Sequence, residues 1–332
     1  MSNIKIVLLA GYGKGARKIF KTNKVFLKIR GTPLFIYVLQ TLLTLETSEK
    51  IVIVGPCDIV RYWVKKYFSL HPSFRQVVCV SQGNTLYENI EIGINEFFPF
   101  FKMAERQICL KNENEPILFL PGDIPLLTKA EVLEFWEKAL QKTSDYCFGV
   151  VTQASIEQFR EKHSLKKLDL FCFPFKEGFF RINNLHFLKP FKLCNGPIIN
   201  KIYELRFLSR AAVKSPLTWE LIRKGYWNAA FYFFLMLCTV ALKKVGLANI
   251  NRVFSVWLPV NKLERIVGGM FGVKISSVEV SDTSAAIDVD TAEDYKIMKT
   301  IFGETSCIGV SKNPLEVVRK GGLEPPRLPT GS

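Results

Sequence analysis

The sequence predicts an α/β fold built on a doubly wound, mostly parallel sheet. Two observations carry this prediction: short apolar runs alternate with stretches of helical spacing between residues 4 and 151, and the same alternation returns near residue 277. Strands that alternate with helices are typical of parallel sheets joined by right-handed crossovers. With 48% hydrophobic and 23% charged residues, the chain of 332 residues has the composition of a globular enzyme with a large core.

Apolar runs predict the strands, and helical spacing with capping residues predicts the helices. Residues 33–46 carry apolar side chains at helical spacing after Pro33, a residue that suits a first helical turn. Asp58 and Thr291 are predicted to cap helices, and Thr128 with Glu131 predicts a capping box. The predicted strands are residues 4–10, 50–56, 74–80, 116–120, 145–151, 277–280 and 285–289. The other predicted helices begin at residue 58 or cover residues 86–98, 128–141 and 292–301.

The regular pattern fails in the middle of the chain, where aromatic clusters and prolines interrupt it. We interpret residues 153–274 as a large basic, aromatic-rich insertion or acceptor-binding subdomain. Residues 1–152 and 275–303 would then form one domain. The tail 312–332 is rich in Gly and Pro without any period, and it is predicted to be disordered.

The positive charge of the chain is concentrated in the same middle part. The formal net charge is +15, and residues 153–270 contain 19 Lys and Arg against 7 Asp and Glu. Such an excess favours a polyanionic partner or an anionic membrane surface for that segment, rather than a nucleic-acid binder throughout. Within it, the apolar run 229–242 is shorter than the roughly 20 residues that span a bilayer. Two readings stay open: a buried helix, or an interfacial helix that gives residues 217–245 a peripheral membrane contact.

Cysteine and histidine usage argues against a zinc site. The eight cysteines form no C-x-x-C pair, and the three histidines lie far apart in the sequence. The first apolar run, residues 4–10, is short and leads into a glycine turn, unlike a secretory signal peptide. We therefore expect a reduced, cytoplasmic protein, with the inner face of the membrane as an additional peripheral location.

Asp123 is the strongest single candidate for chemistry. It follows a run of large apolar residues, 117–120, and a Pro-Gly turn, so it would lie outside the carboxyl end of a buried strand. Ligands of open α/β sheets bind at that edge. A carboxylate beside a dry core usually holds a metal ion or a basic partner. The competing interpretation is an Asp that caps the following helix.

A glycine-rich loop follows the first predicted strand. Gly11, Gly13 and Gly15 let backbone N–H groups approach phosphates, while Lys14 and Arg17 add positive charge. The loop lacks the Gly-Lys-Ser/Thr ending of a Walker loop, and it fits a dinucleotide fingerprint poorly. Further along, Lys24, Lys28 and Arg30 lead into a helix, where they are either phosphate contacts or solvated surface cations.

Two further acids stand near the other end of the chain. Asp288 and Asp290 precede a helix, and the intervening turn would bring either one toward Asp123. Mg²⁺ favours one or two carboxylates together with substrate phosphates, which is the ligand set offered here. After the third predicted strand, the polar residues 81–89 would read a base or ribose, or simply form a loop and helix cap.

The motifs described above, and their order along the chain, resemble those of the MobA-like nucleotidyltransferases, which have the Rossmann-like glycosyltransferase-A type fold. The resemblance covers roughly residues 1–152 and 275–302. Two positions depart from the family pattern: Tyr12 replaces a glycine, and Arg17 lies one place later than the usual arginine. The matching motifs are Leu9-Ala10-Gly11, Lys24 with Gly31-Thr32-Pro33-Leu34, Gly83-Asn84-Thr85-Leu86, Pro121-Gly122-Asp123-Ile124-Pro125 and Asp288-Val289-Asp290-Thr291.

The resemblance implies a role for each motif. The glycine loop would wrap nucleotide phosphates, Lys24 would contact phosphate, and Asp123 would bind Mg²⁺ together with Asp288 or Asp290. Lys24, Arg17 and Asp123 would be catalytic. The nucleotide-binding set would be Leu9, Ala10, Gly11, Gly13, Lys14, Gly15, Lys24, Gly83, Asn84, Thr85 and Asp123.

The expected activity is Mg²⁺-dependent transfer of a nucleoside monophosphate from a nucleoside triphosphate, CTP or GTP, with release of pyrophosphate. The acceptor would be phosphorylated, hydroxyl-bearing or lipid-linked, and no nucleic acid is expected as a partner. A glycosyltransferase of the same fold is an alternative, although such enzymes generally offer Asp-x-Asp where this chain has Asp123-Ile124-Pro125. A non-catalytic module that associates with membranes is a second alternative.

Overall fold

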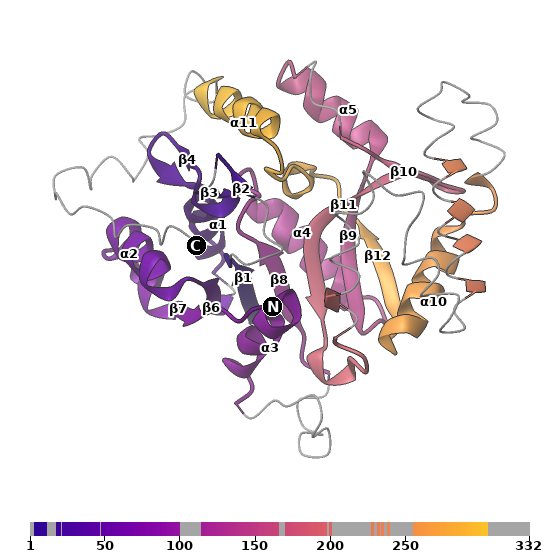
Figure 1. The fold of residues 1–332 in the computed structure, drawn as a ribbon, viewed down its shortest axis with the longest axis horizontal. Coiled ribbons are helices and arrows are strands. Elements are labelled where there is room, and N and C mark those ends of the chain that lie inside the picture. Colours follow the sequence, from indigo (N-terminus) through magenta and orange to yellow (C-terminus); the bar gives the residue numbers. More distant parts are fainter. Residues whose placement is uncertain are drawn as a thin grey trace.

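The structure, a computed structural model, confirms the predicted doubly wound, mostly parallel α/β fold (Figure 1). It describes residues 3–11, 18–20, 22–46, 48–99, 114–165, 170–197, 199–200 and 255–304, together with eight residues between 227 and 239. The glycine-loop residues Gly13, Lys14, Gly15 and Arg17 lie outside the described residues, as do Tyr12 and the tail 312–332.

An eight-stranded sheet with strand order β12-β9-β11-β8-β1-β6-β7 forms the centre of the molecule, and β10 pairs with β11. Parallel pairing joins β8 to β1, β1 to β6, β6 to β7, and β9 to β12. The strands are β1 Ile4–Leu9, β6 Ser48–Gly55, β7 Val77–Ser81, β8 Ile117–Pro121, β9 Tyr146–Thr152, β10 Phe173–Phe175, β11 Gly178–Leu188 and β12 Ile275–Glu279.

Helices cover both faces of this sheet because successive strand residues point in opposite directions. In β1, Ile6 and Leu8 pack with Phe35 of α1, whereas Val7 packs on the other face with Ile94 of α3. The helices are α1 Leu34–Leu43, α2 Cys57–Phe68, α3 Leu86–Asn95, α4 Lys129–Leu140, α5 Gln153–Lys162, α10 Val260–Phe271 and α11 Ala292–Glu304.

Short elements fill the connection between β1 and α1. The two-stranded sheets pair β2 Lys18–Ile19 with β3 Thr22–Asn23, and β4 Lys28–Ile29 with β5 Thr32–Pro33. A 3-10 helix, η1 Lys24–Phe26, lies between them. Its Val25 and Phe26 are buried in the core, and this burial fixes the position of Lys24 at the start of the turn.

Several predicted boundaries are wrong by a few residues. Pro33 precedes α1 instead of lying in its first turn, and Asp58 lies inside α2, whose N-cap is Pro56. Residues 72–76 form a 3-10 helix, η2 Pro72–Gln76, so β7 begins later than predicted. The helix predicted over 86–98 ends at Asn95.

The strand predicted over 285–289 is wrong. Residues 284–286 form a 3-10 helix, η6 Ser284–Ala286, and an irregular segment follows it up to Thr291. Thr291 does cap α11: its Oγ1 accepts from Asp294 N at 3.1 Å, and Asp294 Oδ2 accepts from Thr291 N at 2.7 Å. The chain between η6 and α11 is therefore a loop, and the hydrogen bonds between Thr291 and Asp294 fix the point at which it enters α11.

Part of the segment predicted to lie outside the sheet belongs to the sheet. β11 runs antiparallel between β8 and β9, with Phe187 opposite Leu118 on one side and opposite Cys147 on the other. Its register shifts between Ile182 and His186, and Asn184 has a φ of 62° at this irregularity. β11 therefore carries residues of the middle segment to the carboxyl edge of β8.

Candidate active site

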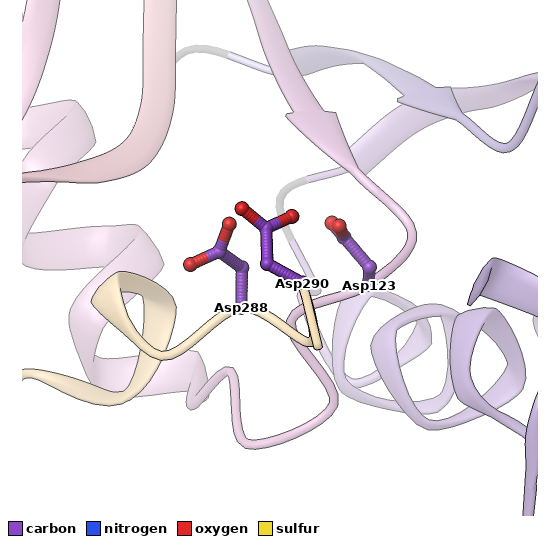
Figure 2. A group of neighbouring side chains, drawn as sticks. All are labelled: Asp123, Asp288 and Asp290. Atoms are coloured by element: carbon purple, nitrogen blue, oxygen red, sulfur yellow. The ribbon is translucent and has the colours of Figure 1, made fainter. Parts of the chain in front are cut away.

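Three carboxylates meet at the carboxyl edge of β8. Asp123 follows this strand, and Asp288 and Asp290 lie in the loop between η6 and α11. One carboxylate oxygen from each of them lies within 4.8 Å of the other two (Figure 2). Backbone bonds fix both segments, because Gly122 N donates to Leu9 O at 2.9 Å and Val289 N donates to Asp123 O at 3.1 Å.

Lys24 is the cation that faces these acids. Its Nζ forms ion pairs with Asp123 Oδ2 and, at 2.6 Å, with Asp290 Oδ1. Asn23 holds the start of η1, since its Oδ1 accepts from Val25 N at 3.2 Å and its Nδ2 donates to Gly11 O at 2.9 Å. The Asn23 side chain thus ties Gly11, two residues after β1, to the turn that begins with Lys24.

Burial and charge act in opposite directions on the ionisation of this cluster. Burial lowers the pKa of the Lys24 ammonium, but the three carboxylates outweigh it and raise that pKa above its ordinary value. Burial raises the pKa of Asp123; Lys24 opposes this rise, and Asp288 and Asp290 add to it. Three acids so close together repel one another, so the cluster favours additional positive charge.

The donor set fits a hard divalent cation. Asp123 is 2% exposed, and its Oδ1 is a buried oxygen without a hydrogen-bond partner in the described part of the chain. Such an oxygen is costly to bury unless it is satisfied, and a metal ion would satisfy it. Carboxylate oxygens are the ligands that Mg²⁺ prefers. The structure thus brings Asp123, Asp288 and Asp290 together, and their role as metal ligands stays a prediction.

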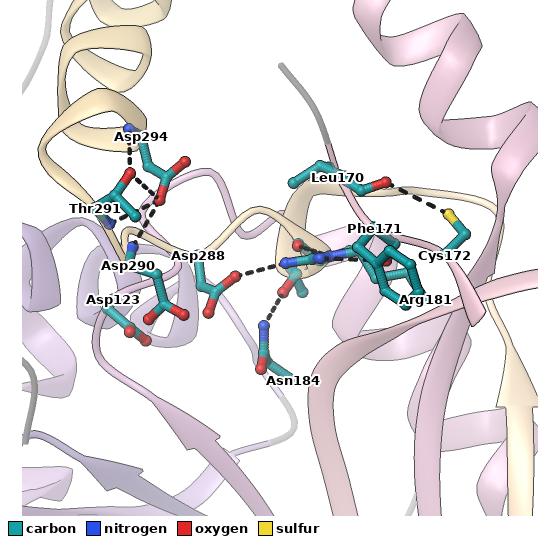
Figure 3. A network of polar contacts seen from close by, with 12 residues as sticks. Asp123, Leu170, Phe171, Cys172, Arg181, Asn184, Asp288, Asp290, Thr291 and Asp294 are labelled. Atoms are coloured by element: carbon teal, nitrogen blue, oxygen red, sulfur yellow. Dashed lines mark hydrogen bonds and ion pairs between the residues drawn. The ribbon is translucent and has the colours of Figure 1, made fainter. Parts of the chain in front are cut away.

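Arg181 of β11 contributes a second cation that the sequence analysis missed. Its Nη2 donates to Asp288 Oδ1 at 2.9 Å, and its Nε donates to Ala286 O at 2.9 Å (Figure 3). Nearby, Asn184 Nδ2 donates to Ala285 O at 2.9 Å. Arg181 and Asn184 thus donate to backbone carbonyls that, in a sheet, would accept from a neighbouring strand. These hydrogen bonds hold the acidic loop against β11.

Glu131 of α4 supports the same loop from inside the core. It is 0% exposed, and it accepts from Ala285 N at 2.9 Å and from Asn183 Nδ2 at 3.1 Å. One part of the predicted capping box is confirmed, because Thr128 Oγ1 accepts from Glu131 N. The other part is wrong, because the Glu131 carboxylate accepts from the loop instead of from the start of its own helix. Burial, followed by the nearby Asp282, raises the pKa of Glu131 to about 9.

Apart from Lys24 and Asp123, the predicted nucleotide-binding residues fall into three groups. Leu9, Ala10 and Gly11 lie at the end of β1, where Ala10 N donates to Val54 O at 2.9 Å. A Cβ at Gly11 would lie 3.2 Å from Asn89 Nδ2, so this glycine packs beside the segment after β7. A further group, Gly13, Lys14 and Gly15, lies outside the described residues, as does the predicted catalytic Arg17.

The second group, Gly83, Asn84 and Thr85, precedes α3. Thr85 is its N-cap and accepts from Glu88 N at 3.2 Å, while Gly83 N donates to Asn89 Oδ1 at 2.7 Å. The helix-cap interpretation of this segment is correct. The same geometry places the segment at the carboxyl edge of β7, near Gly11, which leaves a nucleotide-binding role as a prediction.

The chain resembles known proteins in sequence and in structure. Residues 6–158 match the family model of the MobA-like NTP transferase domain. A 2-C-methyl-D-erythritol 4-phosphate cytidylyltransferase of Endomicrobium trichonymphae is 24% identical over 139 residues, which are 42% of this chain and 54% of that protein. The chain thus matches about half the length of that curated relative.

The chain is also similar to solved structures, and the first of these shares the fold. A hypothetical transferase from Thermus thermophilus has a TM-score of 0.54 at 19% identity, over 88% of this chain and 99% of that chain. A CMP:2-keto-3-deoxy-manno-octonic acid synthetase complexed with CTP has a TM-score of 0.47 at 11% identity, over 92% of this chain and 100% of that chain. Among the described helices, each is too short or too polar to cross a bilayer.

Proposed function

We propose that the protein is a Mg²⁺-dependent nucleotidyltransferase, because residues 6–158 match the family model of the MobA-like NTP transferase domain. It transfers a nucleoside monophosphate from CTP or GTP to a phosphorylated or hydroxyl-bearing acceptor, and pyrophosphate is the second product. The observation that supports this proposal best is the convergence of Asp123, Asp288 and Asp290 on Lys24 at the carboxyl edge of the sheet.

The side chains act by neutralising charge and fixing positions. An acceptor oxygen, which is already anionic in a phosphate and releases its proton to solvent in a hydroxyl, attacks the α-phosphorus. The bond from that phosphorus to the bridging oxygen breaks, and the electron pair leaves with pyrophosphate. Asp123 with Asp288 or Asp290 would hold Mg²⁺, which supplies charge neutralisation on the phosphates. Lys24 moves from its carboxylate partners toward the phosphates, and Arg17 adds a second cation from the glycine loop. Preorganised charges of this kind need no rearrangement of solvent during the reaction.

The cytidylyltransferase name of the sequence relative favours CTP as the donor. The predicted basic character of residues 153–270 suits an acceptor that carries phosphate, including a lipid-linked one. The rival glycosyltransferase reaction would use a nucleotide sugar, and the single Asp123 at the end of β8 supports it less well than an Asp-x-Asp would.

A thermal-shift screen of the four nucleoside triphosphates, with and without Mg²⁺, tests the proposal without knowledge of the acceptor. At a concentration about 100 times its Kd, a bound nucleotide should add about 2.7 kcal/mol to the free energy of unfolding. We expect the largest rise in Tm with CTP and Mg²⁺. Nucleotide sugars, added to the same screen to test the glycosyltransferase alternative, should give smaller rises.

Asp123→Asn is the informative variant, and Asp58→Asn, in the first turn of α2, is its control. The Mg²⁺-dependent part of the rise should disappear in Asp123→Asn and persist in the control. Equal shifts in both variants would exclude Asp123 from the metal site. Pyrophosphate release with candidate acceptors then separates nucleotidyl transfer from simple nucleotide binding.

A further inference from the structure

Large apolar side chains are exposed together on one part of the molecule, far along the chain from the acidic cluster. This part of the chain contains five of the ten large apolar residues that are exposed in the described structure. We name it the aromatic face, and its members are Trp227 (64% exposed), Phe231 (60%), Phe234 (57%), Val256 (56%) and Trp257 (68%).

The aromatic face is one side of a helical segment whose other side is buried. The described residues between 227 and 239 are helical, and Tyr232, Leu235 and Thr239 are 2%, 8% and 0% exposed. Trp227, Phe231 and Phe234 repeat at the helical spacing of four and three residues, so they share the opposite side. Among the described residues of this segment both sides are apolar, and one side is buried while the other is exposed.

Val256 and Trp257 belong to the same surface because the buried sides share one small core. Tyr232 and Leu235 pack with Leu258 and Phe175, and Tyr232 Oη donates to Pro259 O at 2.9 Å. Figure 1 shows the described pieces of residues 227–239 beside α10 and β10, at the right of the molecule. This small core and the hydrogen bond of Tyr232 therefore connect the residues of the aromatic face to one another.

The sequence around the aromatic face is mostly basic, although Glu177, whose Oε2 accepts from Val260 N at 3.0 Å, lies beside the same core. Residues 221–263 contain six Lys and Arg residues and no Asp or Glu. One of them, Lys262, places its Nζ 5.9 Å from the centre of the Tyr232 ring. Because this stretch of the sequence is basic, charge repulsion disfavours its association with a second copy of itself. An anionic surface has the complementary charge.

We propose that the aromatic face docks onto an anionic lipid bilayer. Trp and Phe insert at the boundary between headgroups and acyl chains, and neighbouring cations attract anionic headgroups. A segment with apolar residues on both sides needs the protein beneath it and the lipid above it, and the described helices do not cross the bilayer. This inference concerns location, and it does not depend on the proposed nucleotidyl transfer.

Sedimentation of the full chain with vesicles tests it. One set of vesicles is phosphatidylcholine alone, and in the other part of the phosphatidylcholine is replaced by phosphatidylglycerol. The triple variant Trp227→Ser, Phe231→Ser, Phe234→Ser changes only exposed side chains, so the fold should persist. Leu70→Ser, at a position that is 88% exposed elsewhere on the surface, is the matched control.

We expect the parent and the control to bind the anionic vesicles more strongly than the neutral ones, with binding that weakens as salt is added. The triple variant should bind about tenfold or more weakly, because the inserted apolar area is lost. The nucleotide-dependent thermal shift should be the same in parent and variant, which keeps this test separate from the proposed function. Equal vesicle binding by parent and triple variant would overturn the proposal, as would no binding by the parent or dimerisation through this face.

Discussion

The ion pair between Arg181 and Asp288 offers a quantitative test of how the acidic loop is held. In Arg181→Leu, the Asp288 side chain, 7% exposed, loses its guanidinium partner, and the Ala286 carbonyl loses a donor. Removing one partner of a buried ion pair costs about 3 kcal/mol or more. Arg181 itself is 23% exposed, which places the expected loss of unfolding free energy at the lower end, about 3 kcal/mol.

A double-mutant cycle isolates the pair from the other bonds of Arg181. Asp288→Asn removes the buried charge, so Arg181→Leu should cost about 1 to 2 kcal/mol less in that background than in the parent. Urea unfolding followed by tryptophan fluorescence gives the four free energies, and divalent ions are left out so that no metal compensates. If Arg181→Leu costs the same in both backgrounds, the ion pair does not hold the loop.

Three further predictions concern the cation, the buried acid and the helix packing. Lys24→Met should lower kcat/KM about a hundredfold, and activity within a few-fold of the parent would exclude its phosphate role. The pKa of Glu131 is about 9 when folded and ordinarily 4.5, so its contribution to stability should fall as pH rises between these values, because the unfolded state ionises first. In Glu131→Gln, the urea midpoint should therefore change less between pH 6 and pH 9 than it does in the parent. The same change in both proteins would contradict the raised pKa of Glu131. In α10, Gly268→Ala should lower the free energy of unfolding by about 1 to 3 kcal/mol, because the added Cβ would lie 2.6 Å from Val273 O. Gly269→Ala should raise it by up to about 1 kcal/mol, because no atom lies within 4 Å of the added Cβ. Equal Tm values for the two variants would contradict this.

The order of elements and the meeting of the acids could be predicted because they follow from chain direction. Parallel strands end at one edge, so an acid after residues 117–120 and acids entering the last helix were expected to lie close together. Lys24 could be placed near them only through family resemblance. Its actual position depends on η1, a single turn fixed by the burial of Val25 and Phe26, which has no periodic signal.

The middle segment and the acidic loop could not be predicted, for physical reasons. β11 breaks its alternation at Asn183 and Asn184, one buried and the other at a positive φ, so its sequence does not read as a regular strand. Residues 285–289 are mostly apolar and so resemble a strand, yet side chains bond the backbone of Ala285 and Ala286 in place of a neighbouring strand. Arg181 and Glu131 supply those bonds from distant parts of the chain, and local patterns carry no signal for such partners.

The antiparallel placement of β11 also determines when the sheet can close during synthesis. A ribosome that has made residues 1–152 has produced β8 and β9 without the strand that bridges them. Until residue 188 emerges, the facing edges of these two strands have no partner to pair with. A fragment cut at residue 158, where the matched domain ends, would keep both edges open and should aggregate through them. The stretch that matches the family model therefore lacks the strand that joins the two parts of the sheet.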